Sequence, residues 1–359
     1  MTSPVPNASI LRINAYKQGK SNIEGVKNPI KLSSNESSHG ACEAALSAFK
    51  DSALSLNRYP DGGQTTLRSA IAETFTLDEN KIMCGNGSEE LIGLVVRTFI
   101  NSGDEALLSE NGFIMSNIYC MAQGAELVIA PETDYKVDVD ELLSRVTEKT
   151  KFCTIANPNN PTGTYISDAE MRRLHAGLPK DCVFLVDNAY AEYVDDEDFN
   201  DGSAMVEEFD NVIMTRTFSK IYGLPALRIG WMYTSQAIHD FVQRIRTPFN
   251  ANSAAMAAAT AAVQDTAYTD MIKQHNIQAL DYITLALTAL GIEVVPSVAN
   301  FYLLNFAKVE GKSGGDAGAY LQKNGIIPRP GGGDLLRITV GLDEENQAVI
   351  DVLTAYMNQ

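Results

Sequence analysis

The chain carries five residues whose types and order suit one kind of chemistry. Asn160 lies in a Pro-Asn-Asn-Pro-Thr-Gly stretch, Asp187 and Tyr190 follow it, and Lys220 and Arg228 come next. A lysine amine can form a Schiff base with an aldehyde. A carboxylate can pair with a protonated ring nitrogen, and an arginine fork can hold a phosphate. Together these groups are suited to hold a phosphorylated aromatic aldehyde.

The segments around these residues predict a sheet that positions them. Apolar runs alternate with helical patterns, which predicts a mainly parallel sheet covered on both faces. Asp187 directly follows an apolar run, so its carboxylate is expected at the C-terminal edge of the sheet, where open α/β folds bind ligands. Taken alone, Asp187 could instead cap a turn. The expected strands are 106–108, 126–129, 152–156, 183–186 and 212–215, and the expected helices are 88–99, 139–146 and 167–178.

A glycine-rich turn at 84–90 opens one of these helical patterns and is a candidate anion site. Backbone N–H groups at a helix start bind anions readily, and Ser88 and Glu89 would offer theirs. The turn is neither a Walker loop nor a dinucleotide fingerprint, and many helices begin this way without a ligand. The other expected phosphate donors are Thr217, Ser219 and Arg228.

The order and spacing of these residues resemble the fold-type I aminotransferases, and most of all the histidinol-phosphate aminotransferase family, over residues 16–341. The resemblance implies pyridoxal 5′-phosphate as the cofactor. It implies that Lys220 forms the Schiff base and that Asp187 meets the pyridine nitrogen. It also implies that Tyr190 and Asn160 contact the ring hydroxyl.

The resemblance also assigns two aromatic residues. Phe113 stands where the family stacks a ring on the cofactor, and an ordinary core phenylalanine is the alternative. Around it Asn111 and Gly112 replace the usual Pro-Thr, and Ser116 replaces a common tyrosine. Tyr59 matches the tyrosine that reaches the phosphate of the other subunit, which implies a homodimer with shared sites. An ordinary turn tyrosine is the alternative for Tyr59.

Four further residues match the family's substrate-binding positions. Arg337 matches the arginine that binds the distal anion of the substrate, and Arg329 matches a second arginine that binds a substrate phosphate. Tyr16 matches an N-terminal tyrosine that covers the substrate, and Asn35 is a candidate for lining the same cleft. Arg329 and Tyr16 favour histidinol phosphate, although both could be ordinary surface residues.

With 359 residues, the chain is too long for one ordinary core. The prediction is an N-terminal arm (1–30) packed on the smaller domain or a partner, a large cofactor-binding α/β domain (31–247) and a small α+β domain (248–359). The fold class is therefore that of fold-type I pyridoxal-phosphate transferases. In the small domain the expected helices are 254–263 and 280–290, the expected strands are 293–295, 301–305 and 335–340, and 308–318 is expected to be a glycine-rich surface loop.

Composition excludes several other classes of protein. A net charge of −17 disfavours nucleic-acid and anionic-membrane binding, which need clustered cations. No apolar run has the length of a membrane span and no signal peptide is recognised, so a cytoplasmic protein is expected. The five cysteines fit reduced thiols, with Cys153 and Cys182 in buried strands. The four histidines form no metal motif and are expected at the surface, so no metal is predicted.

The functional hypothesis is an aminotransferase that uses a small-molecule amino donor and a 2-oxo acid. The pair implied by the resemblance is L-histidinol phosphate and 2-oxoglutarate, in histidine biosynthesis. The alternatives are an aromatic amino-acid aminotransferase and a related pyridoxal-phosphate decarboxylase that acts on a phosphorylated amino acid. A non-catalytic cofactor-binding domain is disfavoured by Lys220. A hydrolase based on Ser219 and Lys220 lacks a third partner and an oxyanion motif.

Overall fold

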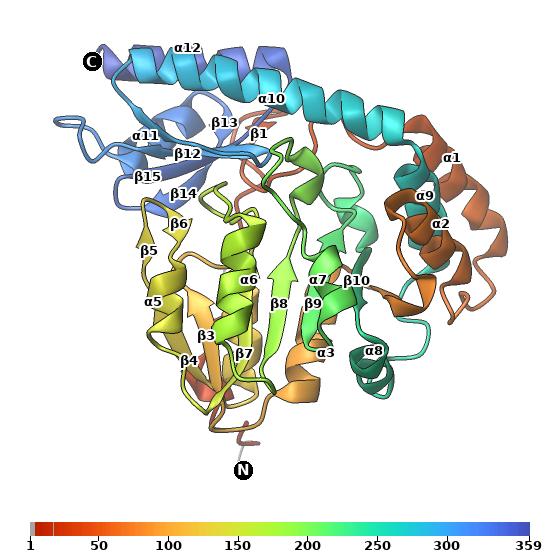
Figure 1. The fold of residues 1–359 in the computed structure, drawn as a ribbon. Helices are drawn as coiled ribbons and strands as arrows, with labels where there is room; N and C mark the ends of the chain where they lie inside the picture. Colours follow the sequence, from red (N-terminus) through yellow and green to blue (C-terminus); the bar gives the residue numbers. More distant parts are fainter. Residues whose placement is uncertain (1–3, 17) are drawn as a thin grey trace.

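The computed structural model describes residues 4–16 and 18–359, and a seven-stranded sheet forms its centre (Figure 1). Its strands, in spatial order, are β2 (Ile82–Gly85), β10 (Gly230–Thr234), β9 (Val212–Thr217), β8 (Val183–Asp187), β7 (Thr150–Ala156), β3 (Glu105–Ser109) and β4 (Glu126–Ala130). The strands from β9 to β4 run parallel, whereas β10 is antiparallel to both of its neighbours. The predicted mainly parallel α/β fold is confirmed, and β2 and β10 are strands that the prediction missed.

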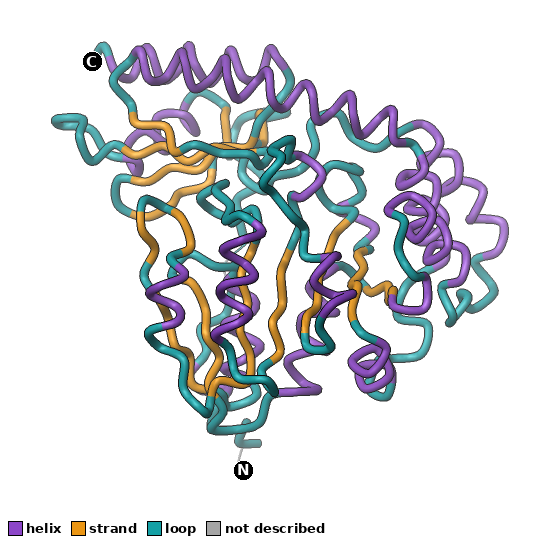
Figure 2. Tube along the Cα trace, in the orientation of Figure 1, coloured by secondary structure: helices purple, strands orange, loops and turns teal. Residues whose placement is uncertain are grey.

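Helices cover both faces of this sheet (Figure 2). Successive strand residues point to opposite faces: Phe184 and Val186 pack in one core cluster, and Val183 and Leu185 pack in another. The first cluster includes side chains of α5 (Val139–Leu143), α6 (Asp168–Gly177) and α7 (Ser203–Glu208), and the second includes those of α3 (Ser88–Phe99), α4 (Ile114–Ala122) and α8 (Gln236–Gln243). The hydroxyl of Ser167 caps α6 as its sequence pattern predicts, while α5 ends three residues before the predicted 146.

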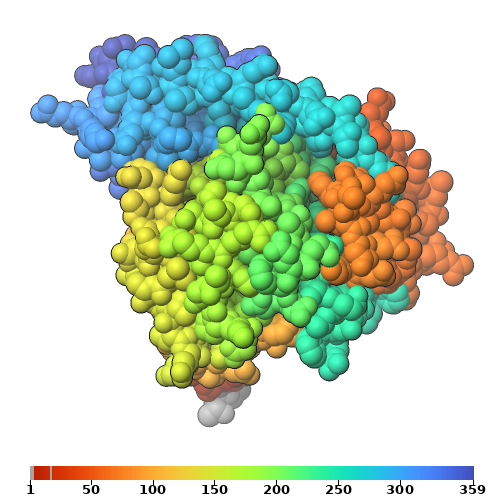
Figure 3. Space-filling view, viewed as in Figure 1, coloured from red at the N-terminus to blue at the C-terminus, as the bar shows by residue number. Residues whose placement is uncertain are grey.

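A smaller antiparallel sheet lies above the large one. Its strands, in spatial order, are β11 (Glu293–Val295), β12 (Phe301–Asn305), β15 (Leu335–Thr339) and β14 (Arg329–Gly332). They pack with α11 (Gly314–Lys323) and α12 (Asp343–Met357) around a separate core cluster. Figure 3 shows this part of the chain, in blue, resting on the yellow and green surface of the larger part.

The prediction of a surface loop at 308–318 is wrong for its second half, because α11 begins at Gly314. The Ser313 hydroxyl accepts a hydrogen bond from the Asp316 N–H group at 3.0 Å and caps the helix. A Cβ atom on Gly314 would lie 2.7 Å from the backbone of Asp334 and Leu335. The glycine therefore permits a close approach of helix and strand rather than marking a loop.

Of the two helices that follow α8, the second contributes side chains to the cores of both sheets. α9 (Ser253–Gln264) packs against α1 (Glu43–Ser52) and α2 (Thr65–Phe75), within the cluster that also includes sheet side chains. α10 (Thr266–Ala289) places Ile272 in that cluster and Ile283 and Leu287 in the core of the smaller sheet. The cores thus divide within α10. The sequence-based division after residue 247 stays a prediction of domain organisation.

The N-terminal segment contacts both parts of the molecule. Ser9 donates a hydrogen bond to the carbonyl of Ala122 in α4 at 3.0 Å, and Arg12 pairs with Glu126 at the start of β4. Farther along, β1 (Ile30–Lys31) pairs in parallel with β13 (Ile326–Ile327) beside the smaller sheet. A short hairpin of β5 (Glu132–Thr133) and β6 (Lys136–Val137) follows β4.

All five cysteines are buried free thiols, as predicted for Cys153 and Cys182. The four histidines, which were predicted at the surface, have intermediate exposure, and the rings of His39 and His275 lie 4.5 Å apart. Within residues 4–16 and 18–359, no group of three or more His, Cys, Asp or Glu side chains is arranged to hold a metal ion. In that same part of the chain, no helix has both the length and the apolarity to cross a membrane.

Candidate active site

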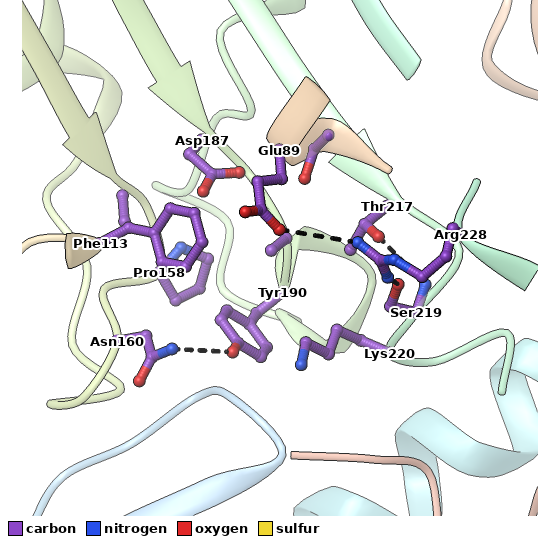
Figure 4. A pocket seen from close by; sticks show the side chains of 13 residues that line it. Glu89, Phe113, Pro158, Asn160, Asp187, Tyr190, Thr217, Ser219, Lys220 and Arg228 are labelled. Atoms are coloured by element: carbon purple, nitrogen blue, oxygen red, sulfur yellow. Dashed lines mark hydrogen bonds and ion pairs between the residues drawn. The ribbon is translucent and has the colours of Figure 1, made fainter. Parts of the chain in front are cut away.

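A cavity of about 190 Å³ lies at the C-terminal edge of the parallel strands (Figure 4). It is bounded by the ends of β7, β8 and β9 and by the start of α3. Most of the residues predicted to contact the cofactor meet here, although they are spread over much of the chain. Those that line the cavity are Ser88, Glu89, Phe113, Asn160, Asp187, Tyr190, Thr217, Ser219, Lys220 and Arg228.

Asp187 is the last residue of β8 and is only 6% exposed. Its Oδ1 atom accepts a hydrogen bond from the hydroxyl of Thr215 at 3.0 Å, and the two residues are register partners across β8 and β9. Burial raises the pKa of Asp187 to about 6, against the opposing effects of Thr215 and Lys220. A buried carboxylate of this kind gains from a cationic partner such as a protonated ring nitrogen.

The hydroxyl of Tyr190 accepts hydrogen bonds from two side-chain amides. Nδ2 of Asn35 donates to it at 2.9 Å and Nδ2 of Asn160 donates at 3.2 Å. Burial raises the pKa of Tyr190 to about 12, so the phenol is neutral near pH 7. Because both amides donate, the phenol keeps its own proton for a further acceptor.

Lys220 follows the end of β9 and reaches back toward the N-terminal part of the chain. Its Nζ atom donates to the carbonyl oxygen of Ser34 at 3.1 Å and lies 5.7 Å from the centre of the Tyr190 ring. Loss of hydration, helped by the nearby charge of Arg337, lowers the pKa of Lys220 to about 8. A useful fraction of this amine is therefore neutral and nucleophilic close to physiological pH.

One end of the cavity, where the sequence predicts anion binding, is organised by Arg228. Its Nη1 atom donates to the Ser219 hydroxyl at 3.2 Å, and the Ser219 N–H group donates to the Thr217 hydroxyl at 3.1 Å. Gly87, just before α3, has φ +86°, and a Cβ atom there would lie 2.6 Å from Arg228 Nη2. The glycine thus lets the start of α3 approach the guanidinium group closely.

The Glu89 side chain makes contacts beyond the predicted role of this residue, which concerned its backbone alone. Its carboxylate turns toward the guanidinium group, with Oε2 lying 3.8 Å from Arg228 Nη2 (Figure 4). Oε1 accepts a hydrogen bond from the Tyr119 hydroxyl at 3.0 Å. A carboxylate in this place repels an anionic ligand of Arg228, since like charges disfavour each other at short range.

A cleft of about 360 Å³ adjoins the cavity and shares Phe113, Asn160 and Lys220 with it. Arg337 of β15 is 8% exposed, and it donates to the Asn160 side-chain oxygen and to the Ser33 carbonyl oxygen. Arg329 of β14 is its register partner, and its Nη2 atom lies 3.5 Å from the Tyr16 hydroxyl. The predicted substrate-binding residues that line this cleft are Tyr16, Asn35, Arg329 and Arg337.

Tyr59 lies apart from the cavity of its own chain. Its side chain is 83% exposed, and its ring stacks on Phe249 with the ring centres 4.8 Å apart. The predicted contact of Tyr59 with a phosphate would therefore need a second copy of the chain.

The fold and the cavity agree with the comparisons to known proteins. The family described as aminotransferase class I and II matches residues 27–353. The chain belongs to this family. Two similar aminotransferases are the histidinol-phosphate aminotransferases of Maricaulis maris (strain MCS10) and Paramagnetospirillum magneticum (strain ATCC 700264 / AMB-1). Each is 46% identical to this chain, and the alignments cover 98% and 99% of both proteins, respectively.

Solved structures of aminotransferases share the fold at lower identity. A histidinol-phosphate aminotransferase from Sinorhizobium meliloti, in complex with pyridoxal-5′-phosphate, superposes with a TM-score of 0.86 at 24% identity, covering 100% of this chain and 95% of that one. An L-threonine-O-3-phosphate decarboxylase from Porphyromonas gingivalis superposes with a TM-score of 0.79, also at 24% identity, over 92% and 100% of the two chains. The fold is thus common to enzymes of both reaction types.

Several residues of the site were not predicted. Ala156, Pro158 and Ala189 line the cavity, and small or apolar side chains carry no chemical signal in a sequence. The sequence pattern predicts Thr215 only as part of a strand, although its position two residues before Thr217 on one face of β9 is a usable signal. The Ser34 carbonyl oxygen is a backbone partner of Lys220, and the residue type at this position does not indicate such a contact.

Proposed function

We propose that this aminotransferase exchanges the amino group between L-histidinol phosphate and 2-oxoglutarate, giving imidazole acetol phosphate and L-glutamate in histidine biosynthesis. The proposal rests on one observation: Arg329 and Arg337 are register partners that line the same cleft as Lys220. Two guanidinium groups offer paired donors to a phosphate or a carboxylate at the far end of a substrate. The names of the two relatives support this choice of substrate.

The groups of the cavity fit pyridoxal 5′-phosphate as the cofactor. Lys220 would hold the aldehyde carbon, Asp187 the ring nitrogen, and Tyr190 with Asn160 the ring hydroxyl. Phe113 would lie against the ring. When bound, the cofactor supplies an electron sink that makes the amine-bearing carbon of the substrate acidic. The phosphate would be held by the backbone of Ser88 and Glu89 and by the side chains of Thr217, Ser219 and Arg228.

Lys220 would also move the proton during transamination. Its neutral Nζ atom would take a proton from the carbon that bears the substrate's amino group. A pKa of about 8 suits both the uptake and the return of that proton near neutrality. The Ser34 carbonyl oxygen, 3.1 Å from Nζ, keeps the amine directed toward the cleft.

We further propose a homodimer in which Tyr59 reaches the phosphate site of the second copy. Tyr59 lies near other exposed apolar residues in the sequence, since Leu54 and Leu56 are 91% and 74% exposed. Large exposed apolar side chains of this kind mark interaction surfaces. Sedimentation should give twice the chain mass, and Tyr59→Ala should weaken cofactor binding. A monomer that binds the cofactor fully would contradict the proposal.

Five free thiols are consistent with a cytoplasmic location.

A spectral titration of the cofactor-loaded protein tests the substrate. L-Histidinol phosphate and L-phenylalanine are added separately, without a 2-oxo acid, and the visible absorbance of the bound cofactor is followed. Conversion to a near-ultraviolet form at far lower concentrations of histidinol phosphate is the expected result. Equal or better conversion by phenylalanine would indicate the aromatic enzyme instead. Release of carbon dioxide from a phosphorylated amino acid, without need of a 2-oxo acid, would indicate the decarboxylase.

A further inference from the structure

One carboxylate joins the loop after β3 to the loop after β7. Glu132 opens the β5–β6 hairpin, two residues after the end of β4. Its Oε1 atom accepts hydrogen bonds from the Ser109 hydroxyl at 2.5 Å and from Asn159 Nδ2 at 3.0 Å. The Asn111 side chain donates to Oε2 at 2.9 Å, and the Asn111 N–H group donates to Oε1 at 3.2 Å. Glu132 thus extends from the end of β4 across β3 to the loop that follows β7.

The two loops that Glu132 joins carry residues of the cavity wall. Phe113 follows Asn111 by two residues, and Asn160 directly follows Asn159. Phe113 and Asn160 each line both the cofactor cavity and the substrate cleft. Glu132 itself lines neither of these two spaces. The carboxylate is therefore placed to set where Phe113 and Asn160 lie without touching what the cavity binds.

Burial makes these hydrogen bonds costly to lose. Asn159 is 1% exposed and Ser109 is 3% exposed. The bond to Glu132 satisfies the side-chain NH2 group of Asn159, whereas its side-chain oxygen is buried without a hydrogen-bond partner among the described residues. A buried donor left without an acceptor carries a desolvation penalty. Without the carboxylate, the Asn159 loop would have to move toward water.

The sequence around Phe113 makes this attachment more important. Asn111 and Gly112 stand where the resembling family has Pro-Thr, so the loop lacks a proline that would fix its backbone. Within the loop, the Gly112 N–H group donates to the Ser109 carbonyl oxygen at 3.2 Å. The bonds from Asn111 to Glu132 supply a second restraint at the position of the missing proline.

We propose that Glu132 is a positioning residue that sets the spacing between Phe113 and Asn160, and through it the fit of the cofactor ring. This rests on the proposed function, in which the cavity binds pyridoxal 5′-phosphate. The neighbouring acid Glu110 provides a matched control. It lies between Ser109 and Asn111 in the same loop, carries the same charge and is exposed.

The test compares Glu132→Ala with Glu110→Ala in the full-length protein. Cofactor affinity is measured by titration of the cofactor-free protein with pyridoxal phosphate. The circular dichroism of the bound cofactor at visible wavelengths reports the orientation of its ring in the cavity. Glu132→Ala should bind the cofactor about tenfold more weakly, because small displacements of positioned groups cost at least this much. Its dichroism should change per bound cofactor, and Glu110→Ala should resemble the wild type in both measurements.

Two milder variants keep the proposal testable if Glu132→Ala does not fold. Glu132→Gln keeps one acceptor oxygen and turns the other into a donor, and Asn111→Ala removes the side-chain bond to Oε2. Both should shift the dichroism in the same direction, by less. Wild-type affinity and dichroism in Glu132→Ala, or in both milder variants if it does not fold, would overturn the positioning role. A wild type that shows no visible band would overturn the proposed function itself, and the positioning role with it.

Discussion

The cofactor cavity and the substrate cleft share Lys220, Phe113 and Asn160, but they are built from different kinds of structure. The floor of the cavity is formed by the ends of buried parallel strands, where Asp187 is fixed through its register with Thr215. The cleft is lined in part by the N-terminal segment and the small sheet, where Tyr16 and Pro330 are exposed although Arg337 is buried. The difference indicates that the residues for the reaction lie on the rigid sheet. The residues that select the substrate lie on segments that are distant from that sheet in the sequence.

The strand β14 illustrates the second kind of structure. Its pairing with β15 shifts register between Pro330 and Gly332, and three of its four residues are exposed. Tyr16, which meets Arg329 from the N-terminal segment, is 50% exposed. Changes at such positions disturb little packing, so the distal end of the cleft can alter without loss of the fold.

The largest expected effect comes from the shared residue Lys220. Lys220→Ala should lower the rate of amino transfer by about 10⁴-fold or more, because it removes the group proposed to act both as the nucleophile and as the carrier of the proton. Single-turnover absorbance measurements would show this. Lys151→Ala, which removes a lysine paired with Asp181 on the surface, is the matched control. Activity within tenfold of the wild type would mean that the cavity is not the reaction site.

Arg329→Ala should affect substrate binding in the cleft without affecting cofactor binding in the cavity. Loss of charged hydrogen bonds to a substrate phosphate should raise the KM for L-histidinol phosphate about 10- to 100-fold. The KM for L-phenylalanine and the cofactor spectrum should change little. Steady-state kinetics with both donors would test this. Equal losses for both donors would argue against a phosphate-specific role of Arg329.

The pKa of Lys220 leads to a prediction about pH dependence that concerns the cavity and not the cleft. Its pKa of about 8 means that the amine is mostly protonated below this pH and mostly neutral above it. The rate of pyridoxal phosphate capture by the cofactor-free protein should therefore rise about tenfold from pH 6 to pH 7 and level off above pH 8. Stopped-flow absorbance would measure this rate. A flat profile over this range would contradict the lowered pKa.

The smallest expected effect concerns Glu89. Its carboxylate lies 3.8 Å from Arg228 Nη2, and both side chains are partly exposed. Glu89→Gln should strengthen cofactor binding by about two- to fivefold, since exposed charge pairs contribute little. Glu90→Gln is the neighbouring control, because Glu90 instead accepts bonds from the Asn86 N–H group and from Asn250. Weaker binding in Glu89→Gln would show that the carboxylate supports the anion site.

The sequence predicted the cavity better than the rest of the structure. Asp187, Tyr190 and Lys220 lie at or shortly after the ends of apolar strands, so local pattern and order were enough to bring them to one sheet edge, whereas Arg228 lies just before β10. β10 was not predicted, because it is only five residues long and begins two residues after Arg228. α11 was misread, because Gly314 suggested a loop, whereas the glycine serves a close approach to Leu335.

Contacts between distant segments could not be predicted from local pattern. The bonds of Asn35 to Tyr190 and of Lys220 to the Ser34 carbonyl oxygen join segments more than 150 residues apart. The register of β8 against β9 depends on packing of the whole sheet. Glu132 carries no motif, and its four hydrogen bonds exist only because β3, β4 and β7 are neighbours.

The single helix α10 has a consequence for how the molecule unfolds. Its 24 residues span about 36 Å, and its two ends are buried in different cores. A fragment that ends at residue 247 would lose α9 and the Ile272 side chain, which complete the core around the sheet. Each core therefore depends on the other for part of its packing. Denaturant should consequently melt both in one cooperative transition, despite the two-layered appearance of the chain.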